Sequence, residues 1–258
     1  KATVKEIVEE LERRGKKPIV SSYVPTVIKF EGPFDFDKSR IYREGKIVIQ
    51  EEAAAAASLI LNPKPGEVVV DMCAAPGGKT THLAEIMKNK GVIYAFDIDK
   101  PRIRRMRELI RRTGVKIVRI FEEDVNNAPE ILGEEVADKV MLDAPCTASG
   151  TIMKNPELRW RLRPEGISEI TQQQYKLLKT AIKLTKPGGK ILYCTCSLFP
   201  EENEELISKI LKEHRELKLV PIKSPYFQGF LEGTMRAWPH KHGTVGFFYA
   251  LLRKKETM

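Results

Sequence analysis

An apolar run leads directly into a glycine-rich turn in the stretch that decides the fold, Val69-Val70-Asp71-Met72-Cys73-Ala74-Ala75-Pro76-Gly77-Gly78-Lys79-Thr80. The apolar run is typical of a buried strand, and the glycines let the backbone approach a ligand closely before a helix begins. From this turn onward, apolar runs alternate with helical segments. That alternation predicts an α/β fold with a mostly parallel sheet and helices on both faces.

The predicted elements follow one another along the 258-residue chain. Strands are expected at 67–71, 92–97, 116–120, 139–142, 190–195 and 245–252. Helices are expected at 51–61, 78–87, 101–112, 168–184 and 200–212. The turn Pro187-Gly188-Gly189 is expected to lead into the strand at 190–195.

Residues 1–50 have a different pattern and are predicted to form a small N-terminal α/β lobe. Val4, Ile7, Val8 and Leu11 lie at helical spacing, and residues 46–49 are strand-like. Residues 51–258 are then expected to form the second, larger domain. Because the chain begins with Lys1 rather than Met, we expect it to be part of a longer protein.

The charge balance points to an anionic partner. The chain has 44 Lys and Arg residues against 35 Asp and Glu, a formal net charge of +9. Nucleic acid is the first expectation and an acidic membrane surface the second. The alternative is a heavily charged, solvated surface of the kind that heat-adapted proteins carry. The sequence has neither a signal peptide nor a long apolar run, so no membrane span is expected.

The four cysteines are too few to form a disulfide framework. The histidines also number four, and together these residues do not predict a metal site. Free thiols are typical of a reducing compartment, so a cytoplasmic location is expected.

The glycine-rich turn fits neither common phosphate-binding motif. A P-loop needs glycine where Cys73 stands, and the segment around Ala75 and Pro76 lacks the spacing of the dinucleotide fingerprint. A nucleoside site without phosphate remains. Asp97 ends the second predicted strand, where an acid can accept hydrogen bonds from ribose hydroxyls, and Asp124 follows the third, within reach of an adenine amino group. S-adenosylmethionine has both groups and no phosphate, so it is the expected cofactor. The alternative is that each aspartate caps a turn.

Two further turns carry cysteines. Asp143-Ala144-Pro145-Cys146 and Thr195-Cys196-Ser197 each follow an apolar, strand-like run. If those strands are neighbours, their carboxyl ends would bring both thiols and Asp143 into one cleft. The alternative for any single cysteine is a small core hydrophobe, which we apply to Cys194 and in part to Cys73.

These motifs occur together with several others: Asn155-Pro156, Arg159-Trp160, Pro200-Glu201-Glu202-Asn203 and Gly246-Phe247-Phe248-Tyr249. Over roughly Lys46 to Lys254, the chain resembles the Nop–Sun family of RNA 5-methylcytosine methyltransferases. The resemblance implies a Rossmann-like class I methyltransferase with a seven-stranded sheet whose last strand is antiparallel. It implies that 51–258 is the catalytic domain and that the lobe at 1–50 assists RNA binding.

The resemblance also implies the site. It places S-adenosylmethionine against Cys73, Ala74, Ala75, Pro76, Gly77, Gly78, Lys79, Asp97, Arg102, Asp124 and Asp143. It implies that Cys196 is the nucleophile and that Cys146 assists product release. The substrate would be cytosine in tRNA or rRNA.

This chemistry explains the residue types. Addition of a thiolate to carbon 6 makes carbon 5 of cytosine reactive toward a methyl donor. A thiolate needs a positive neighbour, for which Lys79 is the candidate. Asp143 is expected to hydrogen-bond the ring-nitrogen edge of the base.

A group of basic residues around an aromatic one is the candidate RNA contact, because it combines charge with a stacking surface. It comprises Lys154, Arg159, Trp160, Arg161 and Arg163. The alternative for Trp160 is a packing anchor.

Three other functions compete with RNA methylation. A DNA cytosine methyltransferase would use Cys146 as nucleophile and would not need Cys196. A non-catalytic RNA-binding or ribosome assembly factor would keep the fold without the activity. A P-loop nucleotidase would bind ATP, although Cys73 stands against it.

Overall fold

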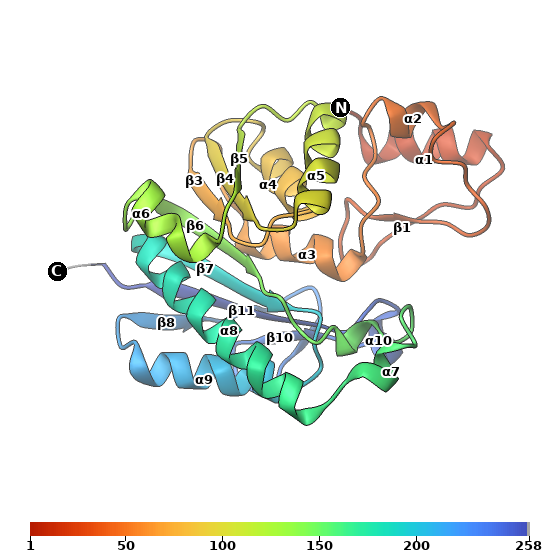
Figure 1. Cartoon of the computed structure of the whole chain (residues 1–258). Coiled ribbons are helices and arrows are strands. Elements are labelled where there is room, and N and C mark those ends of the chain that lie inside the picture. Colours follow the sequence, from red (N-terminus) through yellow and green to blue (C-terminus); the bar gives the residue numbers. More distant parts are fainter. Residues whose placement is uncertain (257–258) are drawn as a thin grey trace.

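One large sheet organises the fold (Figure 1). The strand order is β5-β4-β3-β6-β7-β11-β10-β9, and β8 also pairs with β11. The computed structural model describes residues 1–256. The strands of the sheet are β3 (Val68–Asp71), β4 (Val92–Asp97), β5 (Val118–Glu122), β6 (Ala137–Asp143), β7 (Thr185–Thr195), β8 (Leu217–Val220), β9 (Phe227–Gln228), β10 (Met235–Ala237) and β11 (Phe247–Lys254).

The pairing directions confirm the predicted architecture. Strands β3 to β7 run parallel, and β11 lies antiparallel to β7 and to β8. These seven strands form the expected sheet with an antiparallel last strand. The short strands β9 and β10 extend it beside the first half of β11.

Helices cover both faces of the sheet (Figure 1). They are α3 (Glu52–Leu61), α4 (Gly78–Ile86), α5 (Lys100–Thr113), α6 (Ala128–Leu132), α7 (Leu158–Arg161), α8 (Pro164–Leu184), α9 (Glu204–Glu213) and α10 (Pro239–His242), with 3₁₀ turns η1 (Val125–Asn127), η2 (Ser149–Thr151) and η3 (Pro200–Glu202). Among residues 1–256, no helix is long and apolar enough to cross a membrane.

The core consists of two apolar layers, one on each face. Val140 and Leu142 of β6 pack with α8 and α9 on one face. Met141, between them, packs with the alanines of α3 and with α4 on the other face. This alternation follows from the two-residue repeat of a strand. Because both faces are covered, the parallel strands are apolar on each side.

Several sequence predictions need correction. Pro187-Gly188-Gly189 lies within β7 rather than before it, because a register shift pairs Ala137 with Thr185 and Lys139 with Lys190. The helix expected at 200–212 is divided into η3 and α9 at Asn203, whose φ of −120° and ψ of −101° are not helical. Strand β5 begins at Val118, two residues later than expected.

The N-terminal segment contains α1 (Val4–Arg13), β1 (Ile19–Val20), β2 (Ile28–Lys29) and α2 (Arg40–Arg43). Thr3 and Glu6 form a capping box that starts α1, and Ile7 and Leu11 pack with Ile41 in a small separate core. The strand expected at 46–49 is absent, because the carbonyl of residue 47 accepts from the Arg112 guanidinium instead of a neighbouring strand.

Candidate active site

The carboxyl ends of β3, β6 and β7 meet at one edge of the sheet. In the ladder, Asp71 lies opposite Met141, and Asp143 lies opposite Cys194. The backbone N–H of Ala144 donates to the Cys194 carbonyl at 2.9 Å, which carries the pairing into the following turn. The glycine-rich turn and both cysteine turns therefore lie side by side, as the sequence predicts.

The glycine-rich turn requires Gly77. Its φ of +99° lies in the left-handed region, and a Cβ there would stand 2.8 Å from Cγ of Met106. Gly77 is the N-cap of α4, so the amino end of that helix faces the same edge. The turn is also anchored from below, because the Thr80 hydroxyl donates to Oδ2 of Asp71 at 2.7 Å.

Asp71 is a site residue that the sequence analysis did not single out. Its side chain is buried, and Oδ1 has no hydrogen-bond partner within residues 1–256. Burial raises the pKa of Asp71 to about 7, and the hydrogen bond from Thr80 offsets only part of that effect. A buried carboxyl group therefore lies directly beneath the turn.

Lys79, at the start of α4, and Asp143, the last residue of β6, form an ion pair. The Nζ–Oδ2 distance is 2.6 Å, and the ammonium group also lies 5.4 Å from the centre of the Phe247 ring. Burial alone would lower the pKa of Lys79, but the charge and hydrogen bond of Asp143 together with the charges of Cys194 and Asp71 outweigh it and leave that pKa above its ordinary value. The second carboxylate oxygen of Asp143 accepts from the Cys194 thiol at 3.7 Å.

Cys146 and Cys196 are in direct contact, with their sulfur atoms 3.3 Å apart. Both side chains are half-buried and both thiols are free. The hydrogen bond from Cys146 lowers the pKa of Cys196 although burial and the charge of Asp143 raise it, and the charge of Lys79 lowers it further. The same hydrogen bond, followed by burial, raises the pKa of Cys146. The two thiols are therefore unequal: Cys196 ionises first.

Two glycines hold the cysteine turns against the last strand. The Gly150 N–H donates to the Cys196 carbonyl at 2.9 Å, and the Gly246 N–H donates to the Gly150 carbonyl at 2.8 Å. A Cβ on Gly150 would lie 2.3 Å from the Gly246 carbonyl oxygen, so only glycine fits there.

The predicted cofactor residues next to the turn form a continuous surface. Asp97 is buried and accepts from the backbone N–H groups of Ala75 and Asp99, each at 2.9 Å. The Arg102 guanidinium donates to the Ala75 carbonyl. Ile98, which the sequence analysis did not single out, is 68% exposed although apolar.

This surface fits a nucleoside. Each Asp97 oxygen keeps a lone pair that a ribose hydroxyl can use. The exposed side chain of Ile98 offers an apolar contact to a base, and the turn has no phosphate-binding glycine pattern. Asp124 follows β5, where it caps η1 by accepting from the Asn126 N–H at 2.9 Å. The turn-capping alternative therefore describes its contacts in this structure.

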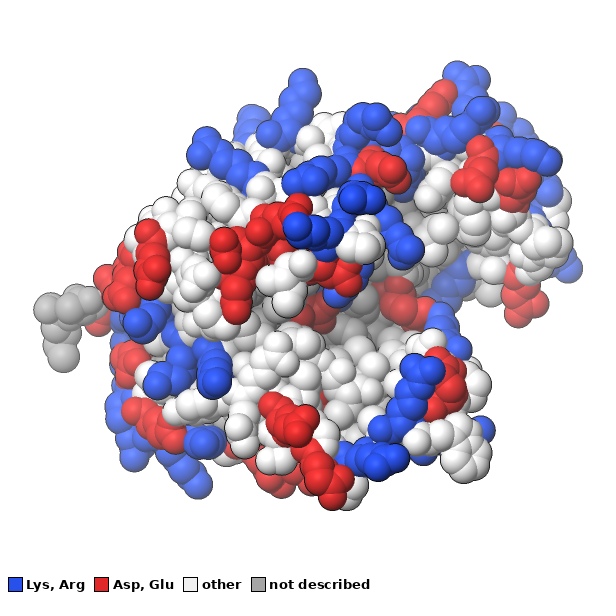
Figure 2. Space-filling view, in the orientation of Figure 1, with Lys and Arg blue, Asp and Glu red and all other residues white. Residues whose placement is uncertain are grey.

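The predicted RNA residues are exposed on and around α7. Trp160 is 82% exposed, so it is not a packing anchor, and that alternative was wrong. Lys154 pairs with Glu51. Figure 2 shows Lys and Arg side chains over α7 and over α5, on either side of a hollow in this face of the molecule.

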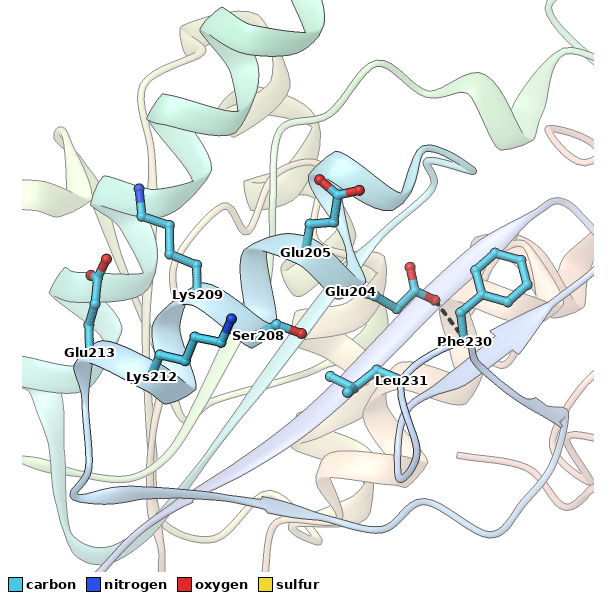
Figure 3. A pocket seen from close by; sticks show the side chains of 8 residues that line it. All are labelled: Glu204, Glu205, Ser208, Lys209, Lys212, Glu213, Phe230 and Leu231. Atoms are coloured by element: carbon cyan, nitrogen blue, oxygen red, sulfur yellow. Dashed lines mark hydrogen bonds between the residues drawn. The ribbon is translucent and has the colours of Figure 1, made fainter.

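The pocket in Figure 3 has neither Cys146 nor Cys196 among its lining residues. It is a hollow of about 440 Å³ between α9 and the loop that carries Phe230 and Leu231, and its rim mixes glutamate and lysine side chains. A second hollow, of about 570 Å³, lies between the N-terminal segment and α4. Neither is lined by a predicted catalytic residue. Within residues 1–256, no group of three or more His, Cys, Asp or Glu side chains could hold a metal ion.

Comparison with known proteins gives consistent matches. Residues 58–253 match the 16S rRNA methyltransferase RsmB/F family. The probable ribosomal RNA small subunit methyltransferase B of Synechocystis sp. is 38% identical over 217 residues, which are 83% of this chain and 49% of that protein. This chain spans about half the length of the curated relatives it matches.

Solved structures agree with that match. The crystal structure of PH0851 has a TM-score of 0.96 and 62% identity, covering 98% of this chain and 57% of its own. The crystal structure of NSun6 from Pyrococcus horikoshii with SFG has a TM-score of 0.88 and 28% identity, covering 99% of this chain and 88% of its own.

Proposed function

The chain belongs to the RsmB/F methyltransferase family, and we propose that it methylates carbon 5 of cytosine in rRNA or tRNA. The observation that carries the proposal is the contact between the Cys146 and Cys196 sulfur atoms, 3.3 Å apart, beside the Lys79–Asp143 ion pair. A single thiol would suffice for simple addition. Two unequal thiols in contact suit a reaction that both makes and breaks a covalent bond.

S-adenosylmethionine is the methyl donor in this proposal, and it supplies a methyl group on a sulfonium centre. The turn from Cys73 to Lys79 would hold it, with the amino end of α4 behind it. Asp97 would accept from the ribose hydroxyls, with Arg102 beside it, and Asp124 would meet the adenine amino group. NSun6, whose structure was solved with SFG, supports a ligand in a fold of this kind.

Cys196 is the proposed nucleophile. Its thiolate adds to carbon 6 of cytosine, and the electron pair of the carbon 5–carbon 6 double bond moves so that carbon 5 becomes enamine-like. Carbon 5 then takes the methyl group. Lys79 favours the thiolate before the attack. Asp143, held by Lys79 on one oxygen, is proposed to hydrogen-bond the ring-nitrogen edge of the base.

Cys146 is assigned to product release. In the free protein its hydrogen bond to Cys196, burial and the charge of Cys196 together raise the pKa of Cys146, so it is a neutral thiol. Once Cys196 has bonded to carbon 6, that charge is gone, and the Cys146 proton passes to water more readily. The Cys146 thiolate then takes the proton from carbon 5. The carbon 5–carbon 6 double bond re-forms, the carbon 6–sulfur bond breaks, and Cys196 leaves as a thiolate.

The RNA would reach this site with its target base unstacked or already in a loop. The exposed ring of Trp160 offers a stacking surface, and the cations near it offer phosphate contacts. These cations are Lys154, Arg159, Arg161 and Arg163. We propose that residues 1–50 form a lobe that assists RNA binding and that 51–258 is the catalytic domain. Free thiols at the site favour a cytoplasmic location.

The test replaces each cysteine in turn by alanine. Each variant is incubated with S-adenosylmethionine carrying a tritiated methyl group and with total RNA from a strain that lacks the gene. Cys196→Ala is expected to transfer no methyl group. Cys146→Ala is expected to accumulate a protein–RNA adduct that survives a denaturing gel, because release is blocked.

Binding of S-adenosylmethionine, measured by calorimetry, serves as the control for both variants. Full methyl transfer by Cys196→Ala would contradict the mechanism. A DNA-type enzyme would be favoured if Cys146→Ala lost activity without forming an adduct and if the unaltered chain methylated DNA. Absence of S-adenosylmethionine binding by the unaltered chain would favour a non-catalytic assembly factor.

A further inference from the structure

We propose that Glu202 is a positioning residue that clamps the two cysteine turns together and makes Cys196, rather than Cys146, the nucleophile. The assignment of those roles rests on the proposed function. Glu202 lies in η3, in the segment between Cys196 and α9. It belongs neither to the RNA surface nor to the cofactor surface described above.

The first set of contacts holds the turn that carries Cys146. The backbone N–H of Thr147 donates to Oε2 of Glu202 at 3.0 Å, and the Thr147 hydroxyl donates to Oε1 at 2.5 Å. Gln174 of α8 donates to Oε2 at 2.8 Å and also to the Pro145 carbonyl at 2.9 Å. The peptide groups on both sides of Cys146 are therefore fixed by one connected group of hydrogen bonds.

The second set of contacts holds the turn that carries Cys196. The Ser197 hydroxyl donates to Oε1 of Glu202 at 2.5 Å. The main-chain carbonyl of Glu202 accepts from the Tyr193 hydroxyl at 2.6 Å, which ties η3 to β7. Glu202 thus joins the residues that follow both cysteines, and the 3.3 Å sulfur–sulfur contact depends on where it holds them.

The charge of Glu202 has no cationic counterpart among the ion pairs of the described residues. Its side chain is fully buried, and its partners in the structure are neutral donors. Glu204, two residues on, shows the contrast, because Arg236 pairs with both of its oxygens. A buried charge acts on nearby groups with little screening by solvent.

That charge discriminates between the thiols. After the hydrogen bond to Cys196, burial and the charge of Cys196, the charge of Glu202 is a further cause that raises the pKa of Cys146. Glu202 is not among the causes that act on Cys196, where Lys79 has the opposite effect. The two thiols touch each other but have different charged neighbours: the charge of Glu202 raises the pKa of Cys146 only, whereas Cys196 lies beside Asp143 and Lys79, whose charges act on its pKa in opposite directions.

The test measures thiol selectivity in the free protein, without RNA or S-adenosylmethionine. Unaltered protein, Glu202→Gln and Glu201→Gln are treated with iodoacetamide at pH 7, and the alkylation rate of each cysteine is followed by mass spectrometry. Cys196 is expected to react faster than Cys146 in unaltered protein. In Glu202→Gln the ratio of the two rates is expected to fall about tenfold, the change that one pKa unit produces. Glu201 is exposed, so Glu201→Gln should leave the ratio within twofold.

Cys194 provides an internal check on folding, because it is fully buried and stays unmodified while the fold is intact. If Cys194 becomes modified in Glu202→Gln, that variant has lost its fold, and Glu202→Asp is used instead. Aspartate keeps the charge but is too short to bridge both turns. It should preserve the selectivity within threefold and lower kcat for methyl transfer at least tenfold, with KM for S-adenosylmethionine within twofold.

An unchanged ratio in folded Glu202→Gln would overturn the inference, and so would full kcat in Glu202→Asp with normal selectivity. The alkylation result is independent of methyl transfer. If the unaltered protein methylated no RNA but Glu202→Gln still lowered the ratio of the two alkylation rates, the proposed function would be rejected, while the effect of Glu202 on thiol selectivity would stand.

Discussion

Lys79 lies at the start of α4 and Asp143 is the last residue of β6, and their charged groups meet with 2.6 Å between Nζ and Oδ2. The pair does two things at once. It fixes the carboxylate that would face the base, and it places a cation near Cys196. The ion pair therefore links the glycine-rich turn, which follows β3, to the reactivity of Cys196, which follows β7. These two strands are not neighbours in the sheet.

Replacing Lys79 by Gln should make Cys196 less reactive. Loss of the cation removes a cause that lowers the pKa of Cys196, so that pKa rises and less thiolate is present at pH 7. A rise of about one pKa unit would slow alkylation of Cys196 about tenfold. Lys100→Gln is the matched control, because Lys100 is an exposed cation paired with Glu122. Equal alkylation rates in the two variants would contradict the role given to Lys79.

Asp71 should make stability depend on pH. Burial raises the pKa of its carboxyl group in the folded protein to about 7, above its ordinary value of 3.8. Below pH 4 both folded and unfolded forms hold the proton. As pH rises from 4 to 7 the unfolded form loses it first, so stability is lost across that window. The shift of about three units corresponds to about 4 kcal/mol.

The measurement compares urea unfolding of the unaltered chain with that of Asp71→Asn at several pH values between 4.5 and 7.5. Asparagine keeps an acceptor for the Thr80 hydroxyl but does not titrate. The difference in unfolding free energy between the two proteins should change in favour of the variant as pH rises. A difference that stays constant with pH would show that Asp71 titrates at its ordinary value.

Gly77→Ala should destabilise the turn. The φ of +99° disfavours any side chain, and the new Cβ would approach Cγ of Met106 to 2.8 Å. A cost of about 1–3 kcal/mol is expected in urea unfolding. Gly166 lies in α8 with open space around it, so Gly166→Ala should instead add about 0.5–1 kcal/mol. Similar effects of the two substitutions would refute the steric argument.

Breaking the buried pair of Arg236 and Glu204 should be costly. Arg236 is fully buried, donates to both carboxylate oxygens and lies 4.9 Å from the Phe230 ring centre. Arg236→Gln leaves an unpaired charge, and a loss of about 3–5 kcal/mol is expected by urea unfolding. Arg253 pairs with Glu256 on the surface, and Arg253→Gln should cost less than about 1 kcal/mol.

Trp160→Ala should weaken RNA binding without affecting stability. The ring is 82% exposed, so its removal should leave the unfolding free energy within about 0.5 kcal/mol. Loss of one stacked base corresponds to about 1–3 kcal/mol in binding. Fluorescence anisotropy with a single-stranded RNA oligonucleotide at fixed salt measures this. Unchanged affinity would remove Trp160 from the proposed RNA surface.

Local pattern was enough to predict most of the fold. Six of the seven principal strands follow from apolar runs bounded by turn residues; β8 was not predicted from the pattern, and the count of seven came from the Nop–Sun resemblance, which the family match confirms. The adjacency of the two cysteine turns also followed from strand order, because parallel strands present their carboxyl ends at one edge. The strand predicted at 46–49 was wrong. A strand-like sequence needs a partner strand, and here the backbone carbonyl of residue 47 accepts from Arg112 instead.

The supporting side chains could not be predicted in the same way. Glu202 stands in a run of acidic residues that looks solvated in sequence, and only the fold shows that it is buried while Glu201 is exposed. Its partners come from three separate segments, carrying Thr147, Gln174 and Ser197. Asp71 lies within a recognisable motif, but whether its Oδ1 has a hydrogen-bond partner depends on what packs around it in the fold.

The hydrogen bonds from Gly246 to Gly150 and from Gly150 to Cys196 bear on how the protein is made. Ribosomes release a chain from its amino end, so both cysteines emerge well before β11. Until then β7 lacks its antiparallel neighbour, and the turn at Gly150 lacks the backbone against which it closes. A nascent chain that has not yet made β11 therefore lacks the hydrogen bond that holds Gly150, and with it the last backbone support of the turn that carries Cys196.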